Sequence, residues 1–128
     1  MNASPQRLDR IFAALADPTR RGMLQRLARG PATVKELGAP YAMSGPAVTK
    51  HLRVLANAGL IARRREGRRH WCRLQTQPMD EASGWIEEQR RAWHAMLDTL
   101  ADYLEAVQRT KEHADEPDQD GHDRSPGN

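Results

Sequence analysis

The chain has 128 residues, the length of one domain with a modest core, and a net charge of +3 at pH 7. It has no apolar run of about 18 residues and no apolar signal-peptide core near its start, so we expect a cytoplasmic protein with no membrane partner. Its single cysteine, Cys72, cannot form a disulfide within the chain.

The charge is unevenly distributed along the chain. Segment 18–74 holds 13 Lys and Arg against two acidic residues, a net charge of +11, whereas 77–110 and 111–128 carry −4 each. A surface that only confers solubility would mix charges of both signs, but here the basic residues cluster. The pattern therefore favours a polyanionic partner for the middle of the chain.

Helix-start signals recur in the first half of the chain. N-cap residues followed by a proline, or paired with a glutamate in a capping box, mark four starts: Ser4, Asp17, Thr33 and Ser44. We expect a first helix after Ser4 and further helices over about 18–29, 34–39 and 44–58. Gly59 is suited to a left-handed cap at the end of the last of these.

Two short strands are expected next, over 60–65 and 69–74. A tight turn at Glu66-Gly67 joins them, with Gly67 supplying a positive φ. A hairpin of this size is not stable alone, so it must pack against the helices.

A long helix is expected after Pro78. Its apolar seam steps by alternating threes and fours, with Gln89 as the one polar member: Ile86, Gln89, Trp93, Met96, Leu100, Tyr103 and Val107. From Lys111 the sequence turns polar and acidic. We therefore divide the chain into a folded domain, 1–110, and a disordered acidic tail, 111–128.

The order of these elements predicts a mainly α (α+β) fold, a winged helix-turn-helix with a long final helix. On helix 44–58, Val48, Leu52, Leu55 and Ala56 form the inward face. Ser44, Gly45, Thr49, Lys50 and Arg53 lie on the polar side or at its start. There, Arg and Lys can pair with guanine or phosphate, and Gly45 allows close approach. Arg68 beside Gly67 can enter an adjacent minor groove.

These segments resemble the ArsR family of bacterial winged-helix transcription regulators. The resemblance covers about residues 7–107, and its most specific block is SGPAVTKHLRVLANAGLI, 44–61. It implies a homodimer that binds inverted-repeat DNA and usually represses. It adds His51 to the DNA-reading helix and places the wing on 64–70, with Arg65, Gly67, Arg68 and Arg69. Whether His51 touches phosphate or supports the turn stays open at this point.

The resemblance also places a dimer surface on the first and last helices, in agreement with the wide apolar stripe of the last helix. The residues expected there are Leu8, Ile11, Phe12, Ile86, Trp93, Leu97, Leu100, Tyr103 and Leu104. A stripe this broad must be buried against more than a small neighbouring helix.

The metal-sensing motifs of the family are missing. The stretch 36–41 has no thiol for a soft metal, and His94 with Asp98 and Asp102 lacks the family spacing. We therefore expect no metal site and no cofactor, and the effector is not specified. Cys72 is expected to be a packed core residue, although flanking arginines leave a redox role open.

Two other classes of function fit the sequence less well than DNA binding does. An enzyme is not expected, because no paired acids, nucleophile with a base, or phosphate loop appears. The alternative is a winged-helix dimerisation module that does not bind DNA. Such a module would not need an arginine-rich wing.

Overall fold

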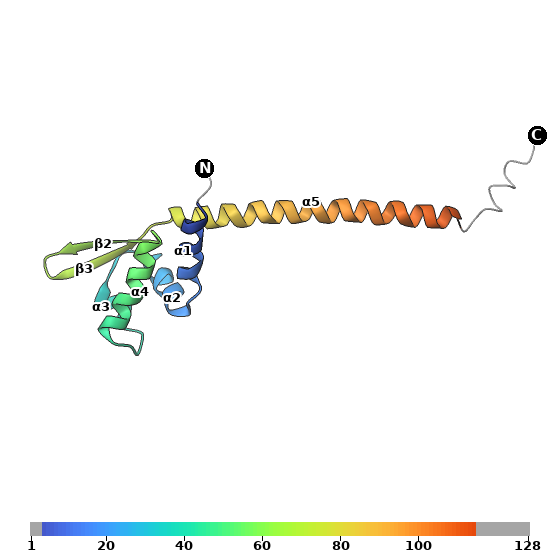
Figure 1. Cartoon of the computed structure of the whole chain (residues 1–128). Coiled ribbons are helices and arrows are strands. Elements are labelled where there is room, and N and C mark those ends of the chain that lie inside the picture. Colours follow the sequence, from blue (N-terminus) through green and yellow to red (C-terminus); the bar gives the residue numbers. More distant parts are fainter. Residues whose placement is uncertain (1–3, 115–128) are drawn as a thin grey trace, which may run out of the picture. The chain divides into compact units, whose positions relative to one another are not determined.

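A computed structural model describes residues 4–114, and within it the chain forms two compact units that divide after Ile86. The elements run in the order α1 (Pro5–Leu15), α2 (Pro18–Leu27), β1 (Ala32–Thr33), α3 (Val34–Gly38), α4 (Gly45–Asn57), β2 (Ile61–Glu66), β3 (Arg69–Leu74) and α5 (Gln77–Ala114) (Figure 1). This is the predicted winged helix-turn-helix. None of the helices in residues 4–114 combines the length and apolar character needed to cross a membrane.

All four predicted helix starts are confirmed. Ser4, Asp17, Thr33 and Ser44 each accept a hydrogen bond on the side chain from a backbone N–H three residues ahead. At α3 the capping box is complete, because Glu36 Oε1 also accepts from Thr33 N at 2.9 Å. The backbone N–H and the hydroxyl of Thr33 both donate to the carboxylate of Glu36, which favours its ionised form and lowers the pKa of Glu36.

The sheet has three antiparallel strands in the order β1-β3-β2. Sequence patterning missed β1, whose two residues are too few to show alternation. In the hairpin Glu66 belongs to β2 and pairs with Arg69, so the turn consists of Gly67 and Arg68, one residue later than predicted. Gly67 has φ of +63°, and no described residue other than glycine has positive φ, which is the pattern of a type II′ turn.

The core of the first unit lies between α4, the helices around it and the inner face of the sheet. Ile11, Leu52, Leu55 and Leu60 have no exposed surface, and α4 packs against α1, α2, α3 and β2. Burying such a side chain stabilises the fold by about 1.5–3 kcal/mol. The predicted inward face of α4 is therefore confirmed for Val48, Leu52 and Leu55, while Ala56 is partly buried and packs against this core.

Helix α5 is longer than expected at its C-terminal end. It continues to Ala114, so the boundary predicted at residue 110 falls inside the helix. The sequence there has neither glycine nor proline before Pro117, and polar residues alone do not stop a helix. The rest of the predicted tail, 115–128, lies outside the described residues.

The contact between α3 and α4 depends on Gly38. A Cβ at Gly38 would lie 2.8 Å from Cγ2 of Val48 and 3.2 Å from Cγ1. Val48 is buried and β-branched, so it cannot easily rotate away. We expect Gly38→Ala to lower the free energy of unfolding by about 1–3 kcal/mol in urea denaturation.

Gly45→Ala is the matched control, because the space above Gly45 is open. It should leave the stability unchanged or slightly raised. In a double-mutant cycle, Val48→Ala should cost less in the Gly38→Ala background than in the wild type. Equal stability of Gly38→Ala and wild type would contradict the close packing of α3 on α4.

Candidate nucleic-acid interface

The burial of one face of α4 decides which side chains the other face presents. With Val48, Leu52 and Leu55 in the core, Lys50 and Arg53 are exposed. No ion pair or hydrogen bond involves either side chain among the described residues. Both charges are therefore available to a polyanion.

The start of α4 is exposed as well. Ser44 and Gly45 lie at the surface, and Ser44 Oγ accepts from Ala47 N at 3.2 Å, so its hydroxyl proton stays available for donation. Unpaired N–H groups at a helix start attract anions. Thr49 and His51, by contrast, are half-buried, and they are the least accessible of the predicted contacts on α4.

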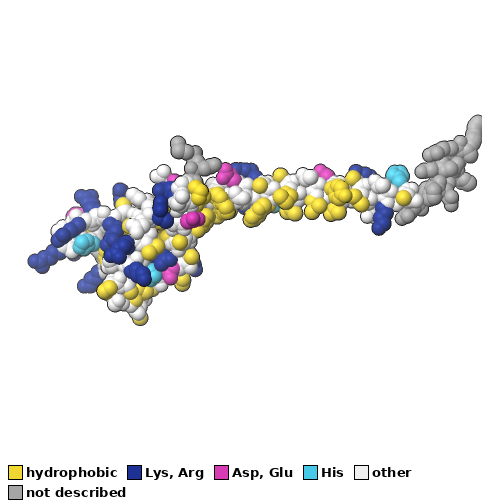
Figure 2. Space-filling model, viewed as in Figure 1, with side chains coloured by type: hydrophobic (Ala, Val, Ile, Leu, Met, Phe, Trp, Pro, Cys, Tyr) yellow, Lys and Arg dark blue, Asp and Glu magenta, His cyan; other side chains and the backbone are white. Residues whose placement is uncertain are grey.

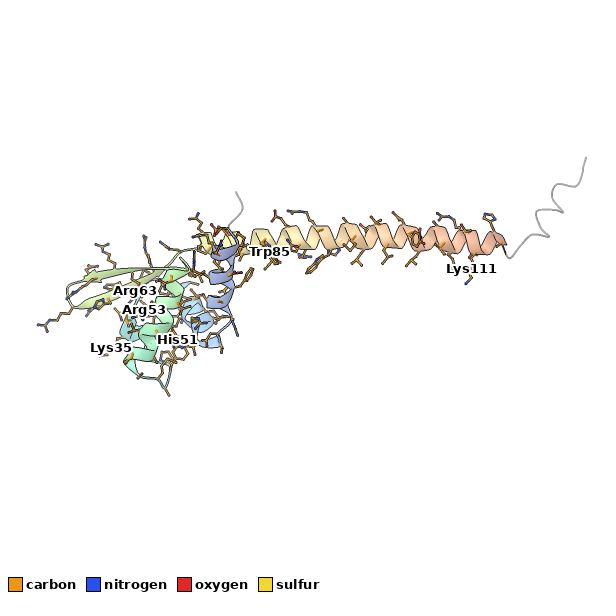
Figure 3. The ribbon with its side chains drawn as sticks, viewed as in Figure 1. Lys35, His51, Arg53, Arg63, Trp85 and Lys111 are labelled. Atoms are coloured by element: carbon orange, nitrogen blue, oxygen red, sulfur yellow. The ribbon has the colours of Figure 1, made fainter. Side chains whose placement is uncertain are left out.

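His51 belongs to a hydrogen-bonded network that ties α4 to the start of α2. Its Nδ1 lies 3.1 Å from Nη1 of Arg20 and 3.9 Å from Oδ2 of Asp17. The same Asp17 oxygen caps α2 by accepting from Arg20 N at 3.0 Å. That backbone hydrogen bond, then the charge of Arg20, lowers the pKa of Asp17. His51 and Arg53 both lie on α4 (Figure 3).

The wing carries exposed arginines on both strands and at its tip. Arg65 Nε donates to the carbonyl oxygen of Gly67 at 3.2 Å, which folds that side chain back over the turn. Arg68 and Arg69 are exposed and make no ion pair within the described residues. Figure 2 shows Lys and Arg side chains gathered over the hairpin and the helices below it.

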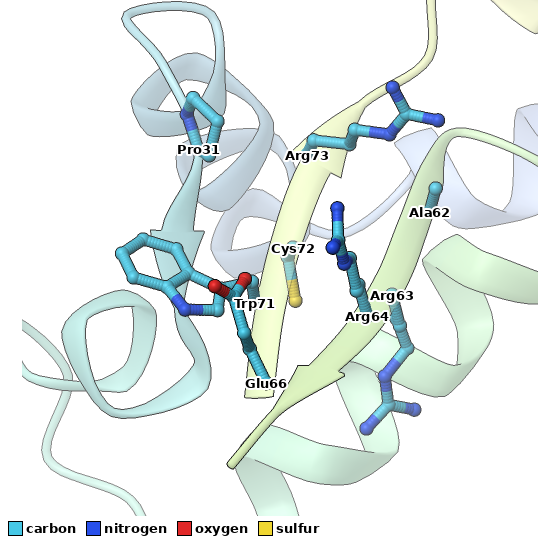
Figure 4. Close-up of a pocket in the computed structure, with 8 residues that line it drawn as sticks. All are labelled: Pro31, Ala62, Arg63, Arg64, Glu66, Trp71, Cys72 and Arg73. Carbon is cyan, nitrogen blue, oxygen red and sulfur yellow. The ribbon is translucent and has the colours of Figure 1, made fainter. Parts of the chain in front are cut away.

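A hollow of about 510 Å³ on the wing adds basic residues that were not among the predicted contacts. It is lined by Pro31, Ala62, Arg63, Arg64, Glu66, Trp71, Cys72 and Arg73 (Figure 4). Arg64 pairs with Trp71 across the strands, while Cys72, one residue on, points into the core. Strand alternation therefore places Arg64 and Trp71 on the outer face of the sheet. Only the strand register, which the sequence does not fix in advance, reveals this pairing.

Known proteins resemble this chain in both sequence and fold. A helix-turn-helix domain family matches residues 15–64. The regulator YuzN of Bacillus subtilis is 36% identical over 87 residues, covering 62% of this chain and 95% of YuzN. The crystal structure of the ArsR family transcriptional regulator RHA00566 is 42% identical, with a TM-score of 0.70, covering 73% of this chain and 97% of that one.

The chain belongs to the ArsR family of transcriptional regulators. The expectation drawn from its motifs is confirmed. The Mycobacterium tuberculosis regulator Rv2034 is 49% identical over 61 residues, 48% of this chain, and the match spans 57% of the length of Rv2034. A homodimeric winged helix-turn-helix DNA-binding domain from Mycobacterium bovis, Mb0332, is 27% identical with a TM-score of 0.53, covering 71% of this chain and 82% of that one.

Within this ArsR-family chain, one member of the predicted dimer surface is corrected. Ile11 has no exposed surface and belongs to the core, because α1 turns that side chain toward the winged unit. Leu8 and Phe12 are half-buried, and Phe12 packs edge-on against Trp85 with ring centroids 5.7 Å apart. Helical spacing finds the apolar side of α1, but it cannot separate the core from the rim.

The apolar residues of α5 beyond Ile86, which is itself 45% exposed, lie at the surface of the second unit. They are 44–68% exposed: Trp93, Met96, Leu97, Leu100, Tyr103, Leu104 and Val107. Figure 2 shows hydrophobic side chains following one side of this helix. A contiguous apolar stripe of this kind marks an interaction surface.

Cys72 is buried, as expected of a packed residue. Burial raises the pKa of its thiol, and the charge of Arg63 opposes this only in part. A buried, protonated thiol is a poor nucleophile. Within residues 4–114, no group of three His, Cys, Asp or Glu is placed to hold a metal ion.

The geometry of the turn generates a prediction for the wing. Arg68 stands at the tip with no partner in the described residues, and a narrow A·T-rich minor groove favours an inserted arginine. We expect Arg68→Ala to weaken DNA binding, most strongly when A·T-rich sequence flanks the site, in fluorescence anisotropy titrations. Arg109→Ala on α5 is the matched loss of charge and should have little effect. Equal affinity of Arg68→Ala and wild type on such flanks would remove the tip from the interface.

Proposed function

We propose that the chain is a homodimeric transcriptional regulator of the cytoplasm, without enzymatic activity, that binds an inverted-repeat operator and represses. The observation that carries the proposal is the unpaired basic surface shared by α4 and the wing. Lys50, Arg53, Arg68 and Arg69 are exposed on two elements of a winged helix-turn-helix. The predicted contacts at Ser44, Gly45, Thr49 and Arg65 belong to the same two elements.

The division of labour follows from the chemistry of each group. The N-terminal half of a recognition helix meets base edges in the major groove. Arg53 can bind the O6 and N7 atoms of guanine with two hydrogen bonds, whereas Lys50 acts as a point charge for phosphate or guanine. The wing then holds the flanking backbone and minor groove. Phosphate contacts fix the position, and base contacts give sequence selectivity.

Dimerisation is supported by the apolar stripe of α5. Seven large apolar side chains beyond residue 86 are exposed on one helix. The seam 86–107 extends about 33 Å at 1.5 Å per residue. Its alternating spacing of three and four is that of a two-helix seam, and Gln89 can set the register. Mb0332, one of the similar proteins of known structure, has a homodimeric winged helix-turn-helix domain.

The alternative function is a dimerisation module that does not bind DNA. It accounts for α5 but leaves the wing unexplained. Six arginines in 63–73 against one glutamate are costly to hold together unless an anion neutralises them. The basic wing therefore favours the DNA-binding proposal.

Arg53→Ala tests how the helix reads DNA. Selection from random-sequence DNA with the wild-type protein supplies the duplex. If Arg53 reads a base, the substitution should cost about 1–3 kcal/mol and relax selectivity at one position of each half-site. Lys50→Ala is the comparison and should weaken all sequences evenly, with a smaller salt dependence if Lys50 contacts phosphate. Unchanged affinity, selectivity and salt dependence of Arg53→Ala would place Arg53 outside the interface.

Leu100→Asp tests the dimer. Leu100 is half exposed in the single chain, so the substitution should leave each winged unit folded. In a dimer it would bury a carboxylate near its symmetry mate, at a cost of several kcal/mol. We expect a monomer in sedimentation velocity experiments and much weaker operator binding. Thr99→Asp, on the same helix but outside the seam, is the matched control. A Leu100→Asp protein that stays dimeric would refute this interface.

A further inference from the structure

The guanidinium of Arg20 is fixed by hydrogen bonds on two of its three nitrogens before it meets His51. Nε donates to the carbonyl oxygen of Ala14 at 2.8 Å, and Nη2 donates to that of Ala13 at 2.9 Å. Those two carbonyls lie in the last turn of α1, where no further helical turn supplies N–H donors, although Ala13 O also accepts from the backbone N–H of Ala16 at 3.2 Å. The planar group is therefore held rigidly, and its remaining nitrogen, Nη1, lies 3.1 Å from His51 Nδ1.

This contact determines which ring nitrogen of His51 carries the proton. A guanidinium can only donate, and it stays charged in proteins. Nδ1 must then be the acceptor, so it has no hydrogen of its own. The hydrogen-bond network thus assigns His51 as a neutral imidazole with its proton on Nε2.

The Nε2–H group is left facing the surface. Within residues 4–114, only Nδ1 of His51 has a hydrogen-bond partner. No buried side-chain nitrogen or oxygen of the described residues lacks a partner. Nε2 is therefore accessible, in agreement with a side chain that is 20% exposed. It lies on the same helix as Lys50 and Arg53.

We propose that Nε2–H of His51 donates a hydrogen bond to a DNA phosphate, and that Arg20 is the positioning residue that fixes the imidazole for this contact. The inference rests on the proposed DNA binding. His51 is short and mostly buried, so it reaches the phosphate backbone beside α4 and not the base edges, which need longer side chains. The carboxylate of Asp17 lies on the Nδ1 side of the ring, 3.9 Å from that nitrogen, and it accepts from the backbone N–H of Arg20.

The neutral state gives this contact a distinctive signature. Salt dependence of DNA binding arises from cations that displace counterions from phosphates. A neutral donor contributes affinity without displacing a counterion. Loss of the His51 contact should therefore lower affinity while leaving the salt slope unchanged, whereas loss of a phosphate contact by Lys50 should reduce the slope by about one.

Two isosteric variants of the full chain separate the two ring nitrogens. In His51→Asn, the amide oxygen can replace Nδ1 as acceptor for Arg20, but no donor remains at the Nε2 position. In His51→Gln, the amide nitrogen reaches the Nε2 position. On the duplex selected by the wild type, we expect His51→Asn to bind roughly tenfold more weakly, the scale of one hydrogen bond to a charged group. His51→Gln should recover most of the loss, and both should keep the wild-type salt slope.

The role of Arg20 is tested without DNA. Long-range ¹H–¹⁵N spectra of the free protein at pH 8 should show the His51 proton on Nε2. Arg20→Lys, which keeps the charge but cannot hold both α1 carbonyls, should show a mixture of the two tautomers together with weaker DNA binding. A proton on Nδ1 in the wild type would overturn the assignment.

The titrations decide the remaining outcomes. His51→Asn with wild-type affinity, or with the reduced salt slope of Lys50→Ala, would overturn the phosphate contact alone. A wild-type protein that selects no DNA would overturn the proposed function, and this inference with it. Thermal melting of each variant identifies any loss that comes from unfolding.

Discussion

The structure depends on the burial of one face of α4. Leu52 and Leu55 are fully enclosed by the surrounding helices and the sheet. At about 1.5–3 kcal/mol for each buried side chain, rotation of this helix would cost a large fraction of the stability of a small domain. Lys50 and Arg53 are thus held outward by the core. The same packing that folds the first unit therefore orients the groups proposed to read DNA.

A second constraint fixes the position of α4 along its neighbours. The side chain of Arg20 donates to carbonyl oxygens at the end of α1, and its remaining nitrogen, Nη1, lies within hydrogen-bond distance of His51 Nδ1. The backbone N–H of Arg20 donates to Asp17, the N-cap residue of α2. One side chain thus joins the start of α2 to both adjacent helices. Apolar packing is not directional, whereas these hydrogen bonds are. They set the position of the imidazole more narrowly than the core could.

Features encoded within a few residues could be predicted from the sequence, and features that need distant partners could not. The four N-caps and Gly67 are local, because the capped N–H lies three residues ahead and the turn needs a positive φ. The pairing of Arg20 with His51 spans 31 positions and depends on how two helices cross. Burial of Ile11 likewise depends on which side of α1 meets the core. Strand β1 exists only because β3 is there to pair with it.

The register of the hairpin keeps the arginines of the wing from lying opposite one another. Each arginine faces a residue of another kind across the strands, as in Arg64 with Trp71, and Glu66 faces Arg69 at the turn. A slip of one residue in either direction would place an arginine opposite an arginine, Arg65 with Arg69 or Arg63 with Arg73. Like charges directly opposite are destabilising, and the slip would also move Cys72 out of the core. Charge and apolar patterning therefore select the same register, and that register keeps Arg68 at the tip.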